Sequence, residues 1–300
     1  MQPNHERIPL EQTESIRCLY WVDSVSEIYM AQDSHRAHSL NGEGDHWHFH
    51  KEFEITCFTQ GNRTRIVGDH IEDRSSPEVL LLGSFLPHYW RENGKTSGFS
   101  IQFNLTEGSP LSCLPEISFF HQLVKRAKRG IVFKDSCQKK LIKLLATMPN
   151  ANAAERLGIL LNMLNIMNKA SQVQWQYISN ATFNLKPDDE NIAKIQEIID
   201  YIITYCETPM SLDDVAKQLN MSKSTLNRHV RKYTGKSFNQ LLIETRLSLV
   251  KRQLIETDRS IVEIALGSGF NNISNFNSCF KKYLGATPKE FRSLQLSQKL

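Results

Sequence analysis

Two copies of one sequence pattern lie about fifty residues apart in the last third of the chain. Ser211-Leu-Asp-Asp-Val-Ala aligns with Ser260-Ile-Val-Glu-Ile-Ala at an offset of 49. One residue is then inserted, and the offset of 50 pairs Leu226 with Phe276, Val230 with Phe280, Tyr233 with Tyr283 and Gly235 with Gly285. A repeat of this length is typical of one supersecondary unit that is present twice. The chain is therefore constrained to build the same small helical unit two times.

Each copy is predicted to be a short helix, a turn and a second helix. Ser211 with Asp214, and Ser260 with Glu263, have the spacing of a capping box, which marks the first turn of a helix. Apolar residues then recur at helical spacing and a glycine follows, as is common where a helix ends. This order of elements is a helix-turn-helix. We expect the two units at residues 211–233 and 260–283.

The second helix of each copy carries the chemistry of nucleic-acid recognition. No acidic residue occurs from Ser222 to Phe238, whereas five basic residues do. In the first copy the outward side chains are predicted to be Ser222, Lys223, Ser224, Thr225, Asn227, Arg228 and Arg231. In the second copy they are predicted to be Ser274, Asn275, Asn277, Ser278 and Lys281. Hydroxyls, amides and guanidinium groups read base edges, and basic groups position the phosphates, so we expect sequence-specific binding of double-stranded DNA.

The same positions resemble the AraC family of bacterial transcription regulators. The matching residues are Leu212-Asp-Asp-Val-Ala, Met221-Ser-Lys-Ser-Thr-Leu, Thr234-Gly-Lys-Ser-Phe, Glu263-Ile-Ala, Gly269-Phe, Phe276, Phe280-Lys-Lys, Gly285-Ala-Thr-Pro and Phe291-Arg. The resemblance implies two recognition helices in adjacent major grooves, a homodimer and, for an activator, contact with RNA polymerase. The family commonly has Arg where this chain has Ser278, so the resemblance carries no guanine contact to that position.

Charge and composition separate the two parts of the chain. Residues 191–300 contain 16 lysines and arginines against 10 acids, whereas residues 1–190 contain 20 against 22. The C-terminal part is therefore the candidate for a polyanionic partner. There is no apolar run of membrane-spanning length, no apolar signal segment at the start and no CxxC pair among the six cysteines. We expect a cytoplasmic protein with reduced thiols and no membrane partner.

Residues up to about Phe103 are predicted to be rich in β-strands. Short alternating or apolar runs, such as Phe53-Glu-Ile-Thr-Cys-Phe and Pro77-Glu-Val-Leu-Leu-Leu, are separated by Gly, Asn, Asp and Pro. Between Leu111 and Met167 the apolar period becomes helical. In the helix near Ala154–Met167, an exposed ridge of Leu157, Leu161 and Leu164 would suit the dimer contact that the resemblance implies. Packing of this helix on the β-structure is the alternative.

A group of histidines with a glutamate is the sharpest feature of the N-terminal part. In His48-Phe-His50-Lys-Glu-Phe-Glu54 the even spacing places the two histidines and the glutamate on one face of a strand, and His88 could join them. The spacing resembles the first cupin motif, whose residues in metal-binding cupins hold Fe, Mn, Zn or Ni. The second cupin motif is degraded, because Ser76-Pro-Glu stands where a Pro-Gly turn is usual. We therefore expect that His88 is not aimed at the other three and that no metal cofactor is bound.

In regulators of the AraC family the cupin-like barrel more often senses a small molecule, frequently a sugar, without a metal. The resemblance therefore implies an effector pocket, for which the candidate lining residues are Trp47, His48, His50, Glu54, His88 and Trp90. Aromatic faces stack on the CH groups of sugars, and polar groups bond their hydroxyls. A divalent metal held by His48, His50, Glu54 and His88 is one alternative. A structural role, with the histidines on a strand edge, is the other.

The sequence as a whole predicts an α+β regulator. We expect a cupin-like β-barrel with following helices over residues 1–180, a linker over 181–190, and an all-α DNA-binding domain over 191–300. The predicted function is ligand-responsive regulation of transcription, of a sugar or other small-molecule utilisation operon, with no catalytic residues. The alternatives are a metal-dependent cupin enzyme with an appended DNA-binding domain, and a constitutive DNA-binding protein without an effector.

Overall fold

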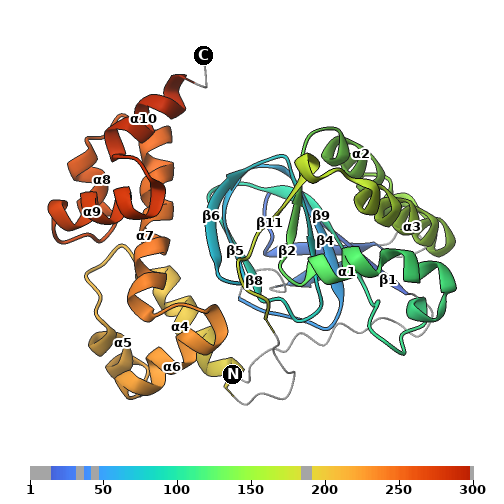
Figure 1. Cartoon of the computed structure of the whole chain (residues 1–300), viewed down its shortest axis with the longest axis horizontal. Coiled ribbons are helices and arrows are strands. Elements are labelled where there is room, and N and C mark those ends of the chain that lie inside the picture. The colour runs from blue at the N-terminus through green and yellow to red at the C-terminus, as the bar shows by residue number, and fades with distance from the viewer. Residues whose placement is uncertain (1–14, 32–36, 42–46, 184–190, 298–300) are drawn as a thin grey trace. The chain divides into compact units, whose positions relative to one another are not determined.

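A computed structural model describes residues 15–31, 37–41, 47–183 and 191–297 of the chain (Figure 1). It divides into two compact units, one of residues 1–70 and 74–190 and the other of residues 71–73 and 191–300. The first combines strands and helices, and residues 191–297 form helices only, so the predicted α+β class is confirmed. The linker expected at 181–190 lies mostly outside the described residues. All six cysteines are free thiols. Within the described ranges no helix is both long and apolar enough to cross a membrane.

The first unit is built from two sheets. One has eight strands in the order β11-β10-β7-β4-β9-β1-β2-β3, and the other has three in the order β6-β5-β8. The strands are β1 Ile16–Trp21, β2 Glu27–Ala31, β3 Ala37–Asn41, β4 Phe53–Gln60, β5 Asn62–Val67, β6 His70–Ser75, β7 Glu78–Leu82, β8 His88–Glu92, β9 Ser97–Phe103, β10 Ile131–Phe133 and β11 Trp175–Tyr177. The last two strands lie after Phe103, the end of the β-rich part that the sequence predicts. They were not predicted because a strand of three residues is too short to show a period of two.

Successive residues of β4 face two different cores. Ile55 and Cys57 belong to the core under the helices, and Phe58 belongs to the core between the two sheets. The antiparallel register with β7 places Glu54 opposite Leu82 and Phe58 opposite Glu78. Because side chains alternate across a strand, Glu54 shares its face with Phe58 and points between the sheets.

The helices of the first unit lie against one side of the large sheet (Figure 1). They are α1 His121–Ala127, α2 Asp135–Leu145 and α3 Ala153–Lys169. In α3, Leu164 is fully buried in the sheet–helix core, while Leu157 and Leu161 are only partly buried against it. The expected ridge of three exposed leucines is therefore wrong for Leu164, since this residue packs inward from the helix face that meets the sheet.

The second unit contains the repeat. Its helices are α4 Ile192–Tyr205, α5 Leu212–Gln218, α6 Lys223–Thr234, α7 Phe238–Glu256, α8 Ile261–Gly267, α9 Ile273–Leu284 and α10 Pro288–Ser297. The expected capping boxes start α5 and α8. Gly235 and Gly285 end α6 and α9 in the left-handed conformation, with φ of 70° and 75°. Each copy therefore begins and ends with its own local signals.

Two arginines hold the two copies of the repeat in the same way. Arg246 on α7 donates through Nε to the Cys206 carbonyl and through Nη2 to the Thr208 carbonyl, both at 2.8 Å, just beyond the end of α4. Arg292 on α10 donates to the Leu254 carbonyl at 3.1 Å near the end of α7, and also to the carbonyl of residue 259. Carbonyls at a helix end have no partner in their own helix. These bonds therefore fix α7 against the end of α4 in the first copy, and α10 against the end of α7 in the second copy.

Candidate DNA interface and effector site

The outward face of α6 is basic, and two of its predicted residues take part in the N-terminal cap of the helix. Ser222 precedes the helix and its Oγ accepts from the Thr225 backbone N–H at 3.1 Å, so both residues contribute to the cap. Lys223 is exposed, but its Nζ lies 3.1 Å from Oδ1 of Asp213 on α5, and this hydrogen bond lowers the pKa of Asp213. Ser224, Arg228 and Arg231 are exposed, while Leu226, Val230 and Tyr233 are buried as predicted.

Asn227 is not an exposed residue of α6, unlike Ser224, Arg228 and Arg231. It is half-buried, and its Oδ1 accepts from the backbone N–H of Phe238, the first residue of α7, at 3.1 Å. The side chain of Asn227 is thus held against α7, with its NH₂ and one lone pair of Oδ1 left for another partner. The residue therefore joins the recognition helix to the next helix, a contact that the sequence pattern alone did not indicate.

The outward face of α9 is built from amides and hydroxyls. Ser274, Asn275, Asn277, Ser278 and Lys281 are all exposed. Asn272 precedes the helix, and its Oδ1 accepts from the backbone N–H groups of Ser274 and Asn275 at 2.8 and 3.1 Å. Asn272 is not among the residues predicted from the sequence, although an Asn directly before a periodic segment is itself a capping signal. No arginine occurs in α9.

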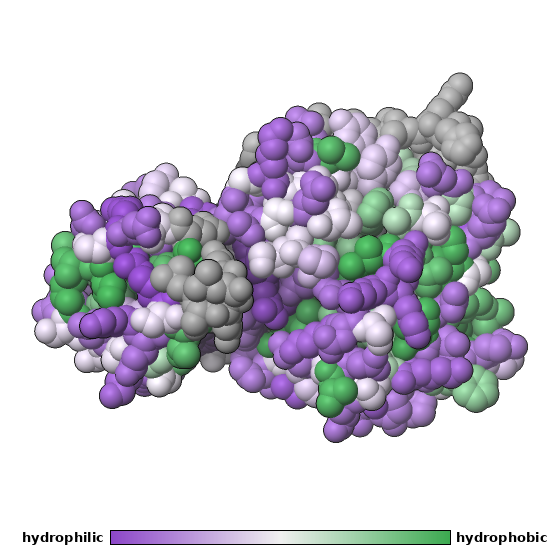
Figure 2. Space-filling view, turned by 90° about the horizontal axis from the view of Figure 1, so that it is seen from above, coloured by the Kyte–Doolittle hydropathy of each residue, from purple (hydrophilic) through white to green (hydrophobic). Residues whose placement is uncertain are grey.

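Positive charge is gathered on both helices without any acid among them. The exposed basic residues are Lys223, Arg228, Arg231, Lys232, Lys281 and Lys282. Figure 2 shows hydrophilic residues over much of one face of the molecule, with several groups of apolar residues between them. Basic groups that flank hydroxyls and amides on one helix face combine phosphate neutralisation with contacts to base edges.

Each of the two helix-turn-helix units contains one recognition helix, α6 in the first and α9 in the second. This arrangement defines a double helix-turn-helix DNA-binding protein. A family model described as a helix-turn-helix domain matches residues 215–293. The chain is similar to the melibiose operon regulatory protein of Escherichia coli (strain K12), with 21% identity over 266 residues, which cover 82% of this chain and 83% of that protein. The C-terminal part is an AraC-type DNA-binding domain, and the chain is a DNA-binding transcription regulator.

Two further relatives match over the C-terminal part only. The HTH-type transcriptional regulator GbdR of Pseudomonas aeruginosa (strain UCBPP-PA14) is 32% identical over 105 residues, which cover 35% of this chain and 29% of that protein. A solved transcriptional regulator with an AraC-type DNA-binding domain, from Chromobacterium violaceum, is 30% identical, with a TM-score of 0.32. That match covers 34% of this chain and 91% of the solved chain.

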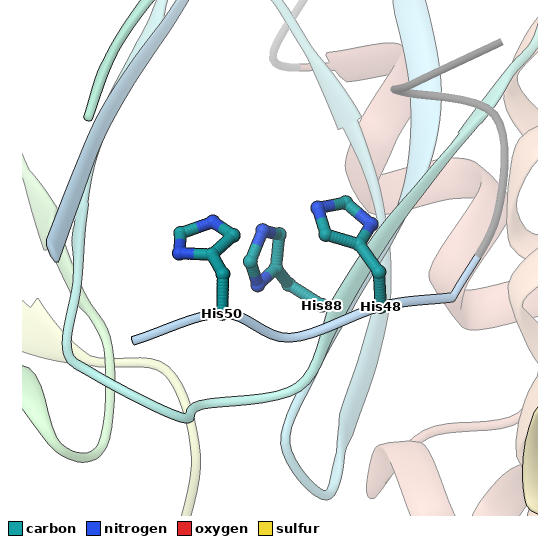
Figure 3. A group of neighbouring side chains, drawn as sticks. All are labelled: His48, His50 and His88. Atoms are coloured by element: carbon teal, nitrogen blue, oxygen red, sulfur yellow. The ribbon is translucent and has the colours of Figure 1, made fainter. Parts of the chain in front are cut away.

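The histidines of the first unit lie together (Figure 3). His48 and His50 come before β4 and not on it, which corrects the expectation of one continuous strand face. The backbones of His48 and His88 exchange two hydrogen bonds, of 3.0 and 2.9 Å, and so bring the start of β8 beside them. One ring nitrogen from each of His48, His50 and His88 lies within 4.8 Å of the others. The expectation that His88 is not aimed at the group is therefore wrong.

Glu54 completes the cluster from the face of β4 between the sheets. Its Oε2 lies 3.0 Å from Nε2 of His50 and 3.7 Å from Nε2 of His88, and it accepts from Nε2 of Gln102 at 3.0 Å. Burial alone raises the pKa of Glu54, but the hydrogen bonds and charges of His50 and His88 hold it well below its usual range. The carboxylate is thus kept ionised between the two sheets.

The two rings beside Glu54 are oriented by backbone carbonyls. Nδ1 of His50 lies 3.1 Å from the Glu52 carbonyl oxygen, and Nδ1 of His88 lies 2.8 Å from the Leu86 carbonyl oxygen. A carbonyl accepts only, so each Nδ1 donates and each Nε2 faces Glu54. Rings held in this way are typical of metal-ligating histidines, whose other nitrogen donates to a carbonyl or carboxylate.

The space beside the cluster is small. A cavity of about 30 Å³ is lined by residues that include His48, Glu54, Trp90 and Gln102. This volume holds a water molecule or an ion, whereas pockets for small organic ligands measure roughly 300–1,000 Å³. Of the two expected tryptophans, Trp90 lines the cavity. Trp47 is buried against Phe49, with ring centroids 6.4 Å apart, and does not line it.

Proposed function

We propose that this chain is a ligand-responsive transcription regulator whose barrel senses an effector at the histidine cluster. One observation carries the proposal: His48, His50, Glu54 and His88 are each at most 5% exposed and converge between the two sheets. Burying ionisable groups is costly, and a hydrophobic core of the same volume would stabilise the barrel at least as well. Since stability alone does not require the cluster, we infer that it binds an effector.

The effector class that we propose first is a sugar or a similar polar small molecule. The similarity to a melibiose operon regulatory protein extends over 82% of this chain and so includes most of the barrel. Since the cavity is about 30 Å³, a sugar would enter only if side chains such as Trp90 moved. Ligand binding would then favour a different conformation of the barrel and shift the population of DNA-binding states.

A divalent metal is the second candidate, and the orientation of the rings favours it. His48, His50 and His88 with Glu54 would hold the ion, and these imidazole and carboxylate ligands suit Fe, Mn, Zn or Ni. A bound ion would supply a Lewis acid to which hydroxyl or carboxylate oxygens of an effector could bind. Gln102 and the two backbone carbonyls would keep the ligands in place.

Both candidates are tested on the full chain, purified without chelator or affinity tag. Its metal content is measured, its melting temperature is followed with sugars and with divalent metal salts, and DNA binding is measured with each ligand that raises the melting temperature. A ligand that binds only the folded form stabilises it. His50→Ala is the test variant, and His121→Ala, an exposed histidine on α1, is the control.

Near one metal per chain in the wild type and in the His121 variant, but not in the His50 variant, would support the metal. Metal-free protein that a sugar stabilises, with the response lost only in the His50 variant, would support the sugar. If no ligand changes melting or DNA binding, and promoter occupancy is constant, the protein is a constitutive DNA-binding protein and the proposal fails.

We further propose a cytoplasmic homodimer that contacts RNA polymerase if it activates, and no enzymatic activity. The partly exposed Leu157 and Leu161 on α3 are the candidates for the dimer contact. A metal-dependent enzyme with an appended DNA-binding domain is the competing possibility. Turnover of a small-molecule substrate, lost in the His50 variant, would support that alternative.

A further inference from the structure

The two recognition helices are equivalent residue by residue. α6 and α9 are each twelve residues long, and every position of α9 is 50 residues after its counterpart in α6. The same offset relates Phe238, which begins α7, to Pro288, which begins α10. It also relates Asn227 to Asn277. Ser237 and Thr287, which directly precede α7 and α10, also match. The hydroxyl of each donates to the side chain three residues later, Gln240 in the first copy and Glu290 in the second.

The difference between Phe238 and Pro288 changes what the two asparagines can do. Asn227 accepts from the backbone N–H of Phe238, which ties its side chain to α7. Proline has no backbone N–H, so Pro288 cannot hold Asn277 in this way. Asn277 is exposed, and none of the residues that the structure describes hydrogen-bonds to its side chain. The amide of Asn277 therefore keeps its acceptor oxygen and both donor hydrogens.

The neighbours of Asn277 indicate which base it would contact. The counterpart of the exposed Arg228 is Ser278, so α9 has no guanidinium that could pair with O6 and N7 of guanine. A free carboxamide has one acceptor and two donors, which match N6 and N7 of adenine in the major groove. The other asparagine on this face, Asn275, has its Oδ1 3.6 Å from the thiol of Cys279, which donates to it.

We propose that Asn277 is a specificity-determining residue that reads an adenine in the half-site bound by α9. Asn227 is its structural counterpart and acts as a positioning residue between α6 and α7. The assignment rests on the DNA-binding function of the two helix-turn-helix units. It predicts two half-sites of different base composition, with an essential adenine in the one that α9 contacts.

The full chain is tested by selection of duplexes from a random library, first for the wild type and then for Asn277→Ala, Asn275→Ala and Asn227→Ala. Binding constants are then measured on the selected site and on single base-pair changes of it. We expect the wild type to lose about 5- to 150-fold in affinity when the adenine is replaced, as one bidentate contact requires. The Asn277 variant should bind both duplexes equally, and the Asn227 variant should keep the discrimination.

A second variant tests the physical cause. Pro288→Ala restores a backbone N–H beside Asn277, so we expect it to capture the amide and reduce the discrimination for adenine. Unchanged discrimination in this variant would contradict the role of Pro288. Retention of the adenine preference in the Asn277 variant, or its loss in the Asn275 variant instead, would overturn the proposal. If the wild type itself selects no sequence, sequence-specific DNA binding fails, and this outcome is distinct from a failure of the assignment to Asn277.

Discussion

The dependence of DNA binding on salt follows from the charges on the two recognition helices. Of the six exposed basic residues on α6 and α9, Lys223 is paired with Asp213, and Nζ of Lys232 donates to the Tyr233 hydroxyl at 3.0 Å, so we assign the other four to phosphates. Each phosphate contact contributes about −0.9 to the slope of log K against log salt, so the expected slope is about −3.6. Between about 50 mM and 200 mM salt, the affinity for any duplex should therefore fall roughly 150-fold.

Removing one of these charges should change the slope by a fixed amount. We expect Arg231→Ala, at an exposed position in the last turn of α6, to make the slope less steep by about 0.9 on every duplex, because a phosphate contact carries no sequence information. Lys95→Ala is the matched control, since Lys95 is exposed in the first unit and bound to Asp23. Fluorescence anisotropy with labelled duplexes at several salt concentrations measures both slopes. An unchanged slope for the Arg231 variant, or a wild-type slope near zero, would refute the assignment of these helices to the phosphates.

Three further outcomes are expected. Arg246→Ala removes two hydrogen bonds from a charged, buried donor and should destabilise the second unit by about 3 kcal/mol, measured by denaturant unfolding; a loss below about 1 kcal/mol would contradict this role. Leu161→Asp should give a folded monomer in sedimentation, whereas Leu164→Asp should unfold the first unit; a dimeric Leu161 variant would place the interface elsewhere. Because the pKa of Glu54 is lower in the folded protein than in the unfolded chain, its charge stabilises the fold above the ordinary glutamate pKa. Glu54→Gln should thus lower the melting temperature at neutral pH, and the difference should shrink as the pH falls below about 4; a constant difference would exclude this linkage.

The helix-turn-helix repeat could be derived from the sequence because its signals are local. A capping serine, its acidic partner three residues later and a terminal glycine act within one or two helical turns, and they identify each helix wherever the rest of the chain lies. The inward positions of Leu226, Val230 and Tyr233 follow from the same helical period, and the structure confirms them. The class of protein was therefore accessible before any tertiary contact was known.

The histidine cluster depended on the tertiary structure. A degraded turn motif predicted that His88 would miss the group, yet the backbone bonds between His48 and His88 close a gap of forty residues and bring it in. Likewise, the sequence predicted the same role for Asn227 and Asn277, as outward residues that contact DNA. Only the packing of α6 against α7 shows that one amide is held by a backbone N–H that proline lacks in the other copy. Local periodicity determines which face a residue occupies, whereas the partner that it meets there is set by contacts between segments distant in the sequence.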